Sequence, residues 1–143
     1  MDTGAALIEL PSEPGAVSVA RQFVSELGSG LDLDLIEDAE LLVSELVTNA
    51  ITHGKPAIVL RVRLLPSGIG VEVRDEGPED PVMTIIQHAR NQRSGRGLGM
   101  VAAVASAWGV RRPETGPGKI VWFTLGPGIE SPLSLPLVLP PLK

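Results

Sequence analysis

The sequence predicts an α+β fold, a two-layer sandwich of a mixed, mainly antiparallel sheet covered on one face by about three helices. Two pairs of segments, 57–65 with 69–76 and 108–112 with 119–126, are each joined by a turn that contains proline and glycine. Such pairs are typical of antiparallel hairpins. Helical periodicity lies outside the hairpins, and this order argues against a doubly wound parallel sheet.

The first third of the chain predicts one strand and one helix. Residues 5–10 (AALIEL) are expected to form a short strand. Apolar residues then recur at helical spacing over about 13–28, with Ser12 as the N-cap and Pro14 in the first turn. Gly28 ends the pattern.

The longest helical pattern covers about 34–53. Asp34 and Glu37 have the spacing of a capping box, and Gly54 follows the last periodic residue. Every expected position of the i, i+3, i+4 pattern is apolar. These positions are Leu35, Ile36, Ala39, Leu42, Val43, Leu46, Val47, Ala50 and Ile51.

The second half of the chain is less regular. Residues 77–96 predict a loop with room for a short helix around 82–90, and a third helix is expected over about 97–107. The tail, 127–143, contains five prolines and is expected to stay outside the fold. The sequence therefore predicts a single domain over 1–126.

Composition excludes several classes of protein. The chain has 143 residues, enough for one domain, and its formal net charge of −5 disfavours direct binding to nucleic acid. It lacks cysteine, which excludes disulfides and thiolate metal sites and suits a reducing compartment. No apolar run is long enough to span a membrane, and the N-terminus does not resemble a signal peptide. We therefore expect a cytoplasmic protein with no membrane partner.

Polar residues on the helix over 34–53 form the first candidate site. Glu45 and Asn49 lie outside the apolar arc, one turn apart, and His53 lies on the side of Asn49. One interpretation is a solvated helix face. The other is a metal-and-water site, because an Asn oxygen suits Mg²⁺ and a Glu one turn away could deprotonate a hydroxyl or a water.

Asp75 is the second candidate. It shares one side of its predicted strand with Ile69, Val71 and Val73, so it ends an apolar stripe. Asp75 could simply start a turn. Alternatively, it is a buried acceptor for a donor such as the exocyclic amine of adenine, with Gly77 allowing a flat ring to approach the backbone.

The glycine-rich stretch SGRGLGM (94–100) is the third candidate. At the start of a helix, its free N–H groups would form an anion site, although a hinge is the alternative. The stretch also fits a dinucleotide fingerprint through Gly97, Gly99 and Ala102. We reject that interpretation because no strand precedes it and no suitable acidic residue follows it.

Together, in this order, the three features resemble the GHKL superfamily of Bergerat-fold ATP-binding domains. LLVSELVTNAITHG (41–54) resembles the family's N box, VEVRDEGP (71–78) its first glycine box and SGRGLGM (94–100) its second. KIVWFTL (119–125) resembles the closing strand of the small stand-alone bacterial members related to anti-sigma-factor serine/threonine kinases. The resemblance covers about 10–126.

The resemblance implies a role for each matching residue. Asn49 would hold the Mg²⁺ that bridges the ATP phosphates, and Glu45 would be the general base. Asp75 would bind the adenine amine, Gly77 would lie against the purine, and His53 would contact the nucleotide. The second glycine box would donate N–H groups to phosphate. Its cofactor-binding residues would be Gly95, Arg96, Gly97, Leu98 and Gly99, and Lys119 on the closing strand could also approach the site.

The first glycine box departs from the family pattern Asp-x-Gly-x-Gly. Glu79 occupies the second glycine position, directly after Pro78. A carboxylate near phosphate is unfavourable unless it points away, so the geometry of the predicted lid differs from that of the family. The short span 78–93 predicts a rather exposed nucleotide.

The resemblance implies an Mg-ATP-binding regulatory protein, an anti-sigma-factor-type serine/threonine kinase. Its protein partners would be a sigma factor and an anti-anti-sigma-like substrate, and such proteins commonly form homodimers. Two alternatives stay open: a non-catalytic ATP-gated binding module, and an interaction protein that has lost nucleotide binding. The segment SPLSLPLVLPPL (131–142) is either a docking segment or a disordered end.

Overall fold

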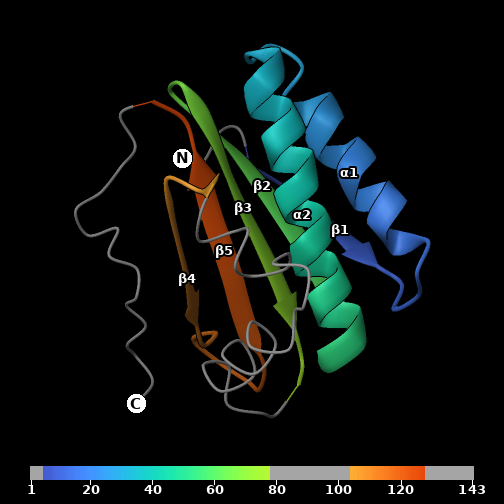
Figure 1. Ribbon diagram of the computed structural model, residues 1–143. Helices are drawn as coiled ribbons and strands as arrows, with labels where there is room; N and C mark the ends of the chain where they lie inside the picture. Colours follow the sequence, from blue (N-terminus) through green and yellow to red (C-terminus); the bar gives the residue numbers. More distant parts are fainter. Residues whose placement is uncertain (1–4, 78–103, 128–143) are drawn as a thin grey trace.

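The computed structural model describes residues 5–77 and 104–127. These parts of the chain form five strands and two helices (Figure 1). In chain order the elements are β1 (Ala5–Leu10), α1 (Ala16–Leu27), α2 (Leu33–His53), β2 (Ile58–Leu65), β3 (Gly68–Asp75), β4 (Ala107–Arg111) and β5 (Lys119–Leu125). The α+β class is confirmed.

The strands form one sheet in the order β1-β2-β3-β5-β4. Each neighbouring pair is antiparallel, so the prediction of a mixed sheet is wrong for the described strands. The reason lies in the connection between β1 and β2. Two helices separate these strands, and each helix reverses the chain, whereas a single crossover helix would make the strands parallel.

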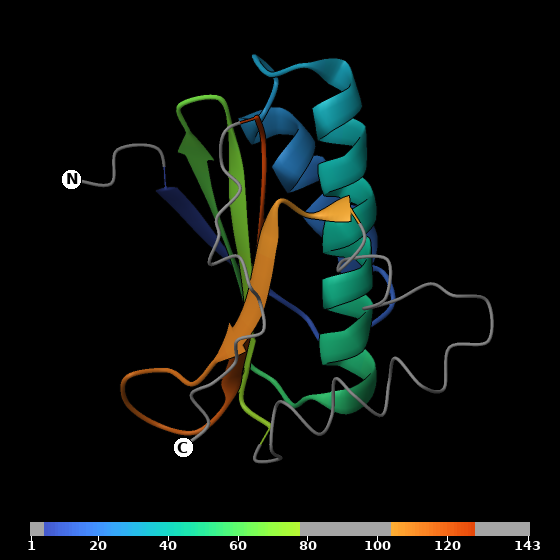
Figure 2. The ribbon, with the colours of Figure 1, turned by 60° about the vertical axis from the view of Figure 1, so that its left-hand side comes forward.

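The core lies between the sheet and the two helices, which cover the same face (Figure 2). α2 contributes buried side chains such as Leu42 and Leu46, and these face buried residues of the sheet such as Val62, Val71 and Phe123. The alternation predicted from the sequence therefore places one side of each central strand in the core. Among residues 5–77 and 104–127, neither helix is long and apolar enough to cross a membrane.

The opposite face of the sheet carries charged side chains among apolar ones such as Leu7 and Ile120. Glu72 on β3 accepts a hydrogen bond from Arg111 at 3.0 Å and forms an ion pair with Arg61 at 3.6 Å. Trp122 lies beside them, because Glu72 pairs with Trp122 in the β3–β5 register. The arginines that alternate with apolar residues in the sequence thus lie away from the helices.

Both predicted helix starts are wrong in detail. α1 begins after Gly15 rather than after Ser12, because the backbone first makes a tight turn in which Ala16 N–H donates to the Glu13 carbonyl. α2 begins at Leu33 with Asp32 as its N-cap. Asp32 makes no capping bond through its side chain, so the predicted capping box with Asp34 and Glu37 is not what starts this helix.

The predicted third helix ends too late. Val104 is helical, but β4 begins at Ala107. Just before β4, Ser106 is already hydrogen-bonded to the end of β5 and the residue after it. Its N–H donates to the Thr124 carbonyl at 2.8 Å, and its hydroxyl accepts from Gly126 N–H at 3.2 Å. Pairing with β5 therefore overrides the helical spacing. Residues 78–103 and 128–143, which hold the rest of this helix, the predicted loop and nearly all of the tail, lie outside the described residues.

Candidate functional site

Asn49 is buried near the C-terminal end of α2. Its side chain is 1% exposed, and its Oδ1 has no hydrogen-bond donor among the described residues. A buried amide oxygen without a donor is unfavourable, and such a group in a native fold calls for an explanation. The interpretation of this helix face as merely solvated is therefore wrong for Asn49.

The orphaned oxygen fits a hard cation. An Asn side-chain oxygen is a suitable Mg²⁺ ligand when phosphate oxygens and waters complete the octahedron. No group of three or more His, Asp or Glu side chains gathers within 5–77 and 104–127. The donor set therefore suits a magnesium ion that arrives with a phosphate ligand better than a metal held by the protein alone.

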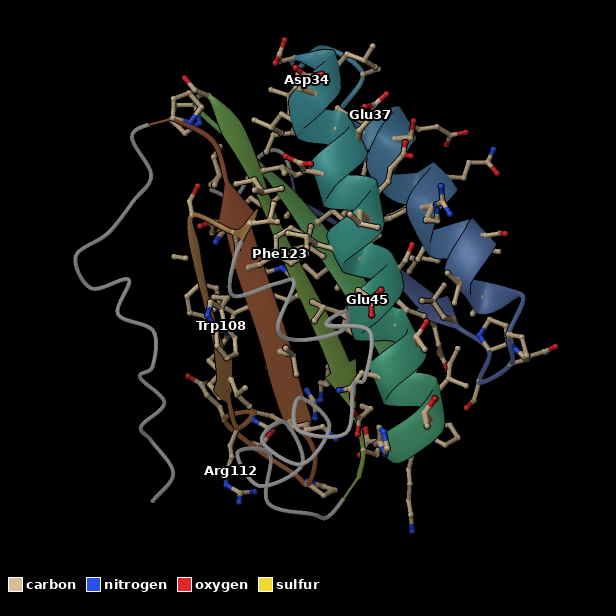
Figure 3. The ribbon with its side chains drawn as sticks, viewed as in Figure 1. Asp34, Glu37, Glu45, Trp108, Arg112 and Phe123 are labelled. Atoms are coloured by element: carbon tan, nitrogen blue, oxygen red, sulfur yellow. The ribbon has the colours of Figure 1, made fainter. Side chains whose placement is uncertain are left out.

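Glu45 and His53 flank Asn49 on the same helix. Glu45 lies one turn earlier and is half-buried, and Figure 3 shows it on α2. His53 is the last residue of α2 and is exposed. The helix therefore presents a carboxylate and an amide oxygen one turn apart, as the spacing predicts.

Asp75 is the last residue of β3, and it is 2% exposed. Its Oδ1 accepts a hydrogen bond of 2.7 Å from Gly77 N–H, two residues further on. This is the geometry of an Asx turn. Asp75 therefore starts a turn, as one interpretation predicts, and it is also buried, as the other interpretation requires.

Lys119, which the family resemblance places only near the site, is the partner of Asp75. It is the first residue of β5 and lies opposite Asp75 in the β3–β5 register. Its ammonium is 3.2 Å from Asp75 Oδ1 and 3.0 Å from Oδ2, and its side chain is 0% exposed. The buried Asp75 carboxylate therefore has two donors within the protein, the Lys119 ammonium and the Gly77 N–H.

The sequence contains a signal for Lys119. It shares its parity with Val121, Phe123 and Leu125, all of which are buried on the helix-facing side of β5. A lysine at the end of such a stripe must be buried or must leave the strand. A buried lysine needs an anionic partner, and Asp75 is the corresponding anion at the end of the neighbouring stripe.

Close backbone packing surrounds the Asp75 carboxylate. A Cβ at Gly54 would lie 2.6 Å from both carboxylate oxygens, and one at Gly77 would lie 2.9 Å from Oδ1. Glu76 N–H also donates to the Lys55 carbonyl at 2.8 Å. These contacts hold the end of α2 against the end of β3. The requirement for glycine at position 54 comes from this approach, because its φ of −106° is open to any residue.

We expect Gly54→Ala to displace the Asp75 carboxylate and to lower the free energy of unfolding by about 1–3 kcal/mol, because the added methyl group overlaps a buried ion. Gly30→Ala is the matched control, since a Cβ there would have nothing within 4 Å. Urea denaturation of the two variants measures the difference. Equal stabilities would show that the carboxylate can move at no cost.

Five of the predicted nucleotide-binding residues belong to the second glycine box. Gly95, Arg96, Gly97, Leu98 and Gly99 all lie outside the described residues, as does Glu79. The described part of the site therefore consists of Glu45, Asn49 and His53 on α2 and of Asp75, Gly77 and Lys119 at the end of the sheet.

Two hollows of the described surface lie elsewhere. One, of about 230 Å³, is lined by Arg61, Arg63 and Trp122 among others, and the second, of about 660 Å³, by Arg74 and Arg112 among others. Both open on the sheet face away from the helices, and neither is lined by the six residues of the site.

Comparison with known proteins places the chain in a family. The model of the histidine kinase-like ATPase domain matches residues 10–125, so the chain belongs to that family. A family of ATPase domains is a family of nucleotide-binding domains. The resemblance to the GHKL superfamily of ATP-binding domains is confirmed, and the match has nearly the bounds expected from the motifs.

One solved structure shows the same fold. It contains the RsbU and RsbW domains of Rv1364c from Mycobacterium tuberculosis and superimposes with a TM-score of 0.63 at 23% sequence identity. The match covers 85% of this chain and 31% of the other, so the chain spans about a third of its length. A search of curated proteins finds no match.

Proposed function

We propose that this protein binds Mg-ATP and transfers the γ-phosphate to a serine or threonine hydroxyl of a protein partner. The observation that carries the proposal is the buried Oδ1 of Asn49, which has no donor among residues 5–77 and 104–127 and lies one turn after Glu45 on α2. Membership of a family of ATPase domains supports a nucleotide as the ligand. The arrangement supplies a metal ligand and a base beside each other.

Four of the described site residues would have a part in binding Mg-ATP or in the transfer of phosphate. Asn49 Oδ1 would be a ligand of Mg²⁺, which neutralises charge on the phosphate oxygens when bound. Glu45 would accept the proton of the attacking hydroxyl while the oxygen forms a bond to the γ-phosphorus and the bond to the β-phosphate oxygen breaks, leaving ADP. Asp75 would accept a hydrogen bond from the 6-amino group of adenine, and Gly77 would lie against the ring.

The remaining contacts to the nucleotide are proposed from the resemblance alone. His53 would contact the nucleotide at the end of α2. Gly95, Arg96, Gly97, Leu98 and Gly99 would hold the phosphates. The amides of this segment and the Arg96 guanidinium would meet the charge that spreads over the transferring phosphoryl group.

The partner class follows from the related kinases. We propose an anti-anti-sigma-like protein as the substrate and a sigma factor as the protein that is sequestered, within the cytoplasm. The fold shared with a structure that contains an RsbW domain supports this class. A homodimer is proposed from the family resemblance alone. The proposal predicts that phosphate transfer, rather than ATP binding alone, depends on Glu45.

Transfer of labelled γ-phosphate from Mg-ATP tests this role. In an extract of the cells that make the protein, we expect Glu45→Gln to lower labelling of the partner at least 100-fold with ATP affinity unchanged, because only the proton acceptor is removed. Glu37→Gln, an exposed substitution on the same helix, is the control. Equal labelling by both variants would refute the assignment of the base. ATP binding with no labelling by any form would favour the ATP-gated binding module.

A further inference from the structure

The ion pair between Lys119 and Asp75 leaves hydrogen-bonding capacity unused. An ammonium carries three donors, and a carboxylate has about four acceptor sites. Within residues 5–77 and 104–127, the two Asp75 oxygens are the only acceptors of Lys119, and Asp75 Oδ2 accepts only from Lys119. Among these described residues, one donor and one acceptor therefore remain on adjacent groups that are both almost completely buried.

The unused groups lie where a ring is expected. The Lys119 ammonium would be 3.6 Å from a Cβ at Gly77, and Asp75 Oδ1 would be 2.9 Å from it. Since Gly77 has no Cβ, a planar group that lies against Gly77 has both the ammonium and the carboxylate beside it. Buried polar groups in native proteins are almost always hydrogen-bonded, so these positions favour a polar ligand edge.

Adenine has a matching edge. Its 6-amino group is a donor, and a ring nitrogen that accepts lies on either side of it. The Asp75 carboxylate can therefore accept from the 6-amino group while the Lys119 ammonium donates to a ring nitrogen beside it. Guanine has a carbonyl oxygen in place of the amino group, and that oxygen would face the carboxylate as acceptor against acceptor. For a ring held in that position against Gly77, the pair therefore favours adenine over guanine.

We propose that Lys119 contacts the base directly, donating a hydrogen bond to the ring nitrogen beside the 6-amino group, and that Lys119 and Asp75 together set specificity for adenine. This proposal rests on the proposed function, because it assumes that ATP binds at Asp75. It assigns to Lys119 more than the neutralisation of a buried carboxylate, since the same ammonium then serves both Asp75 and the ligand.

Analogues of ATP that lack one ring nitrogen test the contact. The full-length chain is titrated with the magnesium complexes of ATP, 1-deaza-ATP, 7-deaza-ATP and GTP. We expect one of the deaza analogues to bind about tenfold or more weakly than ATP, the loss typical of a hydrogen bond from a charged donor, and GTP to bind more weakly still. Wild-type protein that binds ATP and both deaza analogues equally would overturn the proposal.

Variants of Lys119 separate contact from structure. In Lys119→Met the deaza analogue and ATP should bind within twofold of each other, because no donor remains to be lost. Lys119→Gln keeps an N–H donor, should retain part of the discrimination, and is the variant to use if Lys119→Met does not fold. Tighter ATP binding by Lys119→Met would overturn the proposal by showing that Lys119 occupies the place of the base. A chain that binds no ATP at all would instead refute the proposed function itself.

Discussion

Replacing Asn49 by leucine is expected to abolish magnesium-dependent ATP binding while stabilising the fold. The leucine side chain has nearly the same size, but the change removes the buried Oδ1, which has no donor in the part of the chain that the structure describes. Relief of an unsatisfied buried polar group is worth about 1–3 kcal/mol, so the free energy of unfolding should rise. ATP affinity in the presence of Mg²⁺ should fall at least 100-fold, because the proposed metal ligand is lost.

A gain in stability together with a loss of ATP affinity is expected when a residue serves binding and destabilises the fold. The exposed neighbour Thr48, replaced by alanine, is the control and should change neither property. Urea denaturation and nucleotide titration on the same preparations measure both. A large loss of stability in Asn49→Leu with Mg-ATP binding retained would make Asn49 a structural residue and remove the observation on which the proposed function depends.

Removal of Lys119 is expected to have the largest effect on stability. Lys119→Met leaves the Asp75 carboxylate buried with only the Gly77 N–H as a donor among the described residues. Breaking a buried ion pair from one side costs about 3–5 kcal/mol, because a charge is left uncompensated. The total stability of a small domain is about 5–15 kcal/mol, so this single change should lower the midpoint of unfolding markedly.

The double variant Lys119→Met/Asp75→Leu tests the cause. Replacing both members of a buried pair by apolar residues is often neutral, so it should recover most of the stability lost in the single variant. A double-mutant cycle in urea provides the coupling energy. Additive losses in the cycle would show that the two side chains do not stabilise each other. Unlike Lys119→Met, the double variant should not bind ATP, because it also lacks the acceptor proposed for the adenine amine.

Local patterns predicted most of the fold. α2 and the β2–β3 hairpin follow unbroken apolar periodicity, and their bounds differ from the predicted ones by a residue or so. The N-caps of α1 and α2 differ from the predicted ones, because backbone turns precede these helices and neither helix starts with a side-chain capping bond. The start of β4 was missed because Ala107 is paired with Thr124, a contact that sequence spacing cannot reveal.

The residues of the candidate site could likewise be predicted only in part. Asn49 and Glu45 follow from helical spacing, and the burial of Asp75 follows from strand alternation. The spacing could not decide whether Asn49 faces solvent or protein, because that depends on the sheet against which α2 packs. Lys119 was undervalued because it lies 44 residues from Asp75 and meets it only through the β3–β5 pairing. The spacing of residues in the sequence does not predict the order of strands in the sheet, on which this contact depends.

Calorimetric titration of the purified protein with ATP, with and without Mg²⁺, tests the central claim most directly. We expect heat of binding at one site per chain that depends on Mg²⁺ and disappears in Asn49→Leu. No heat at millimolar ATP in either condition, from a protein shown to be folded, would contradict the account and would favour an interaction protein that has lost nucleotide binding.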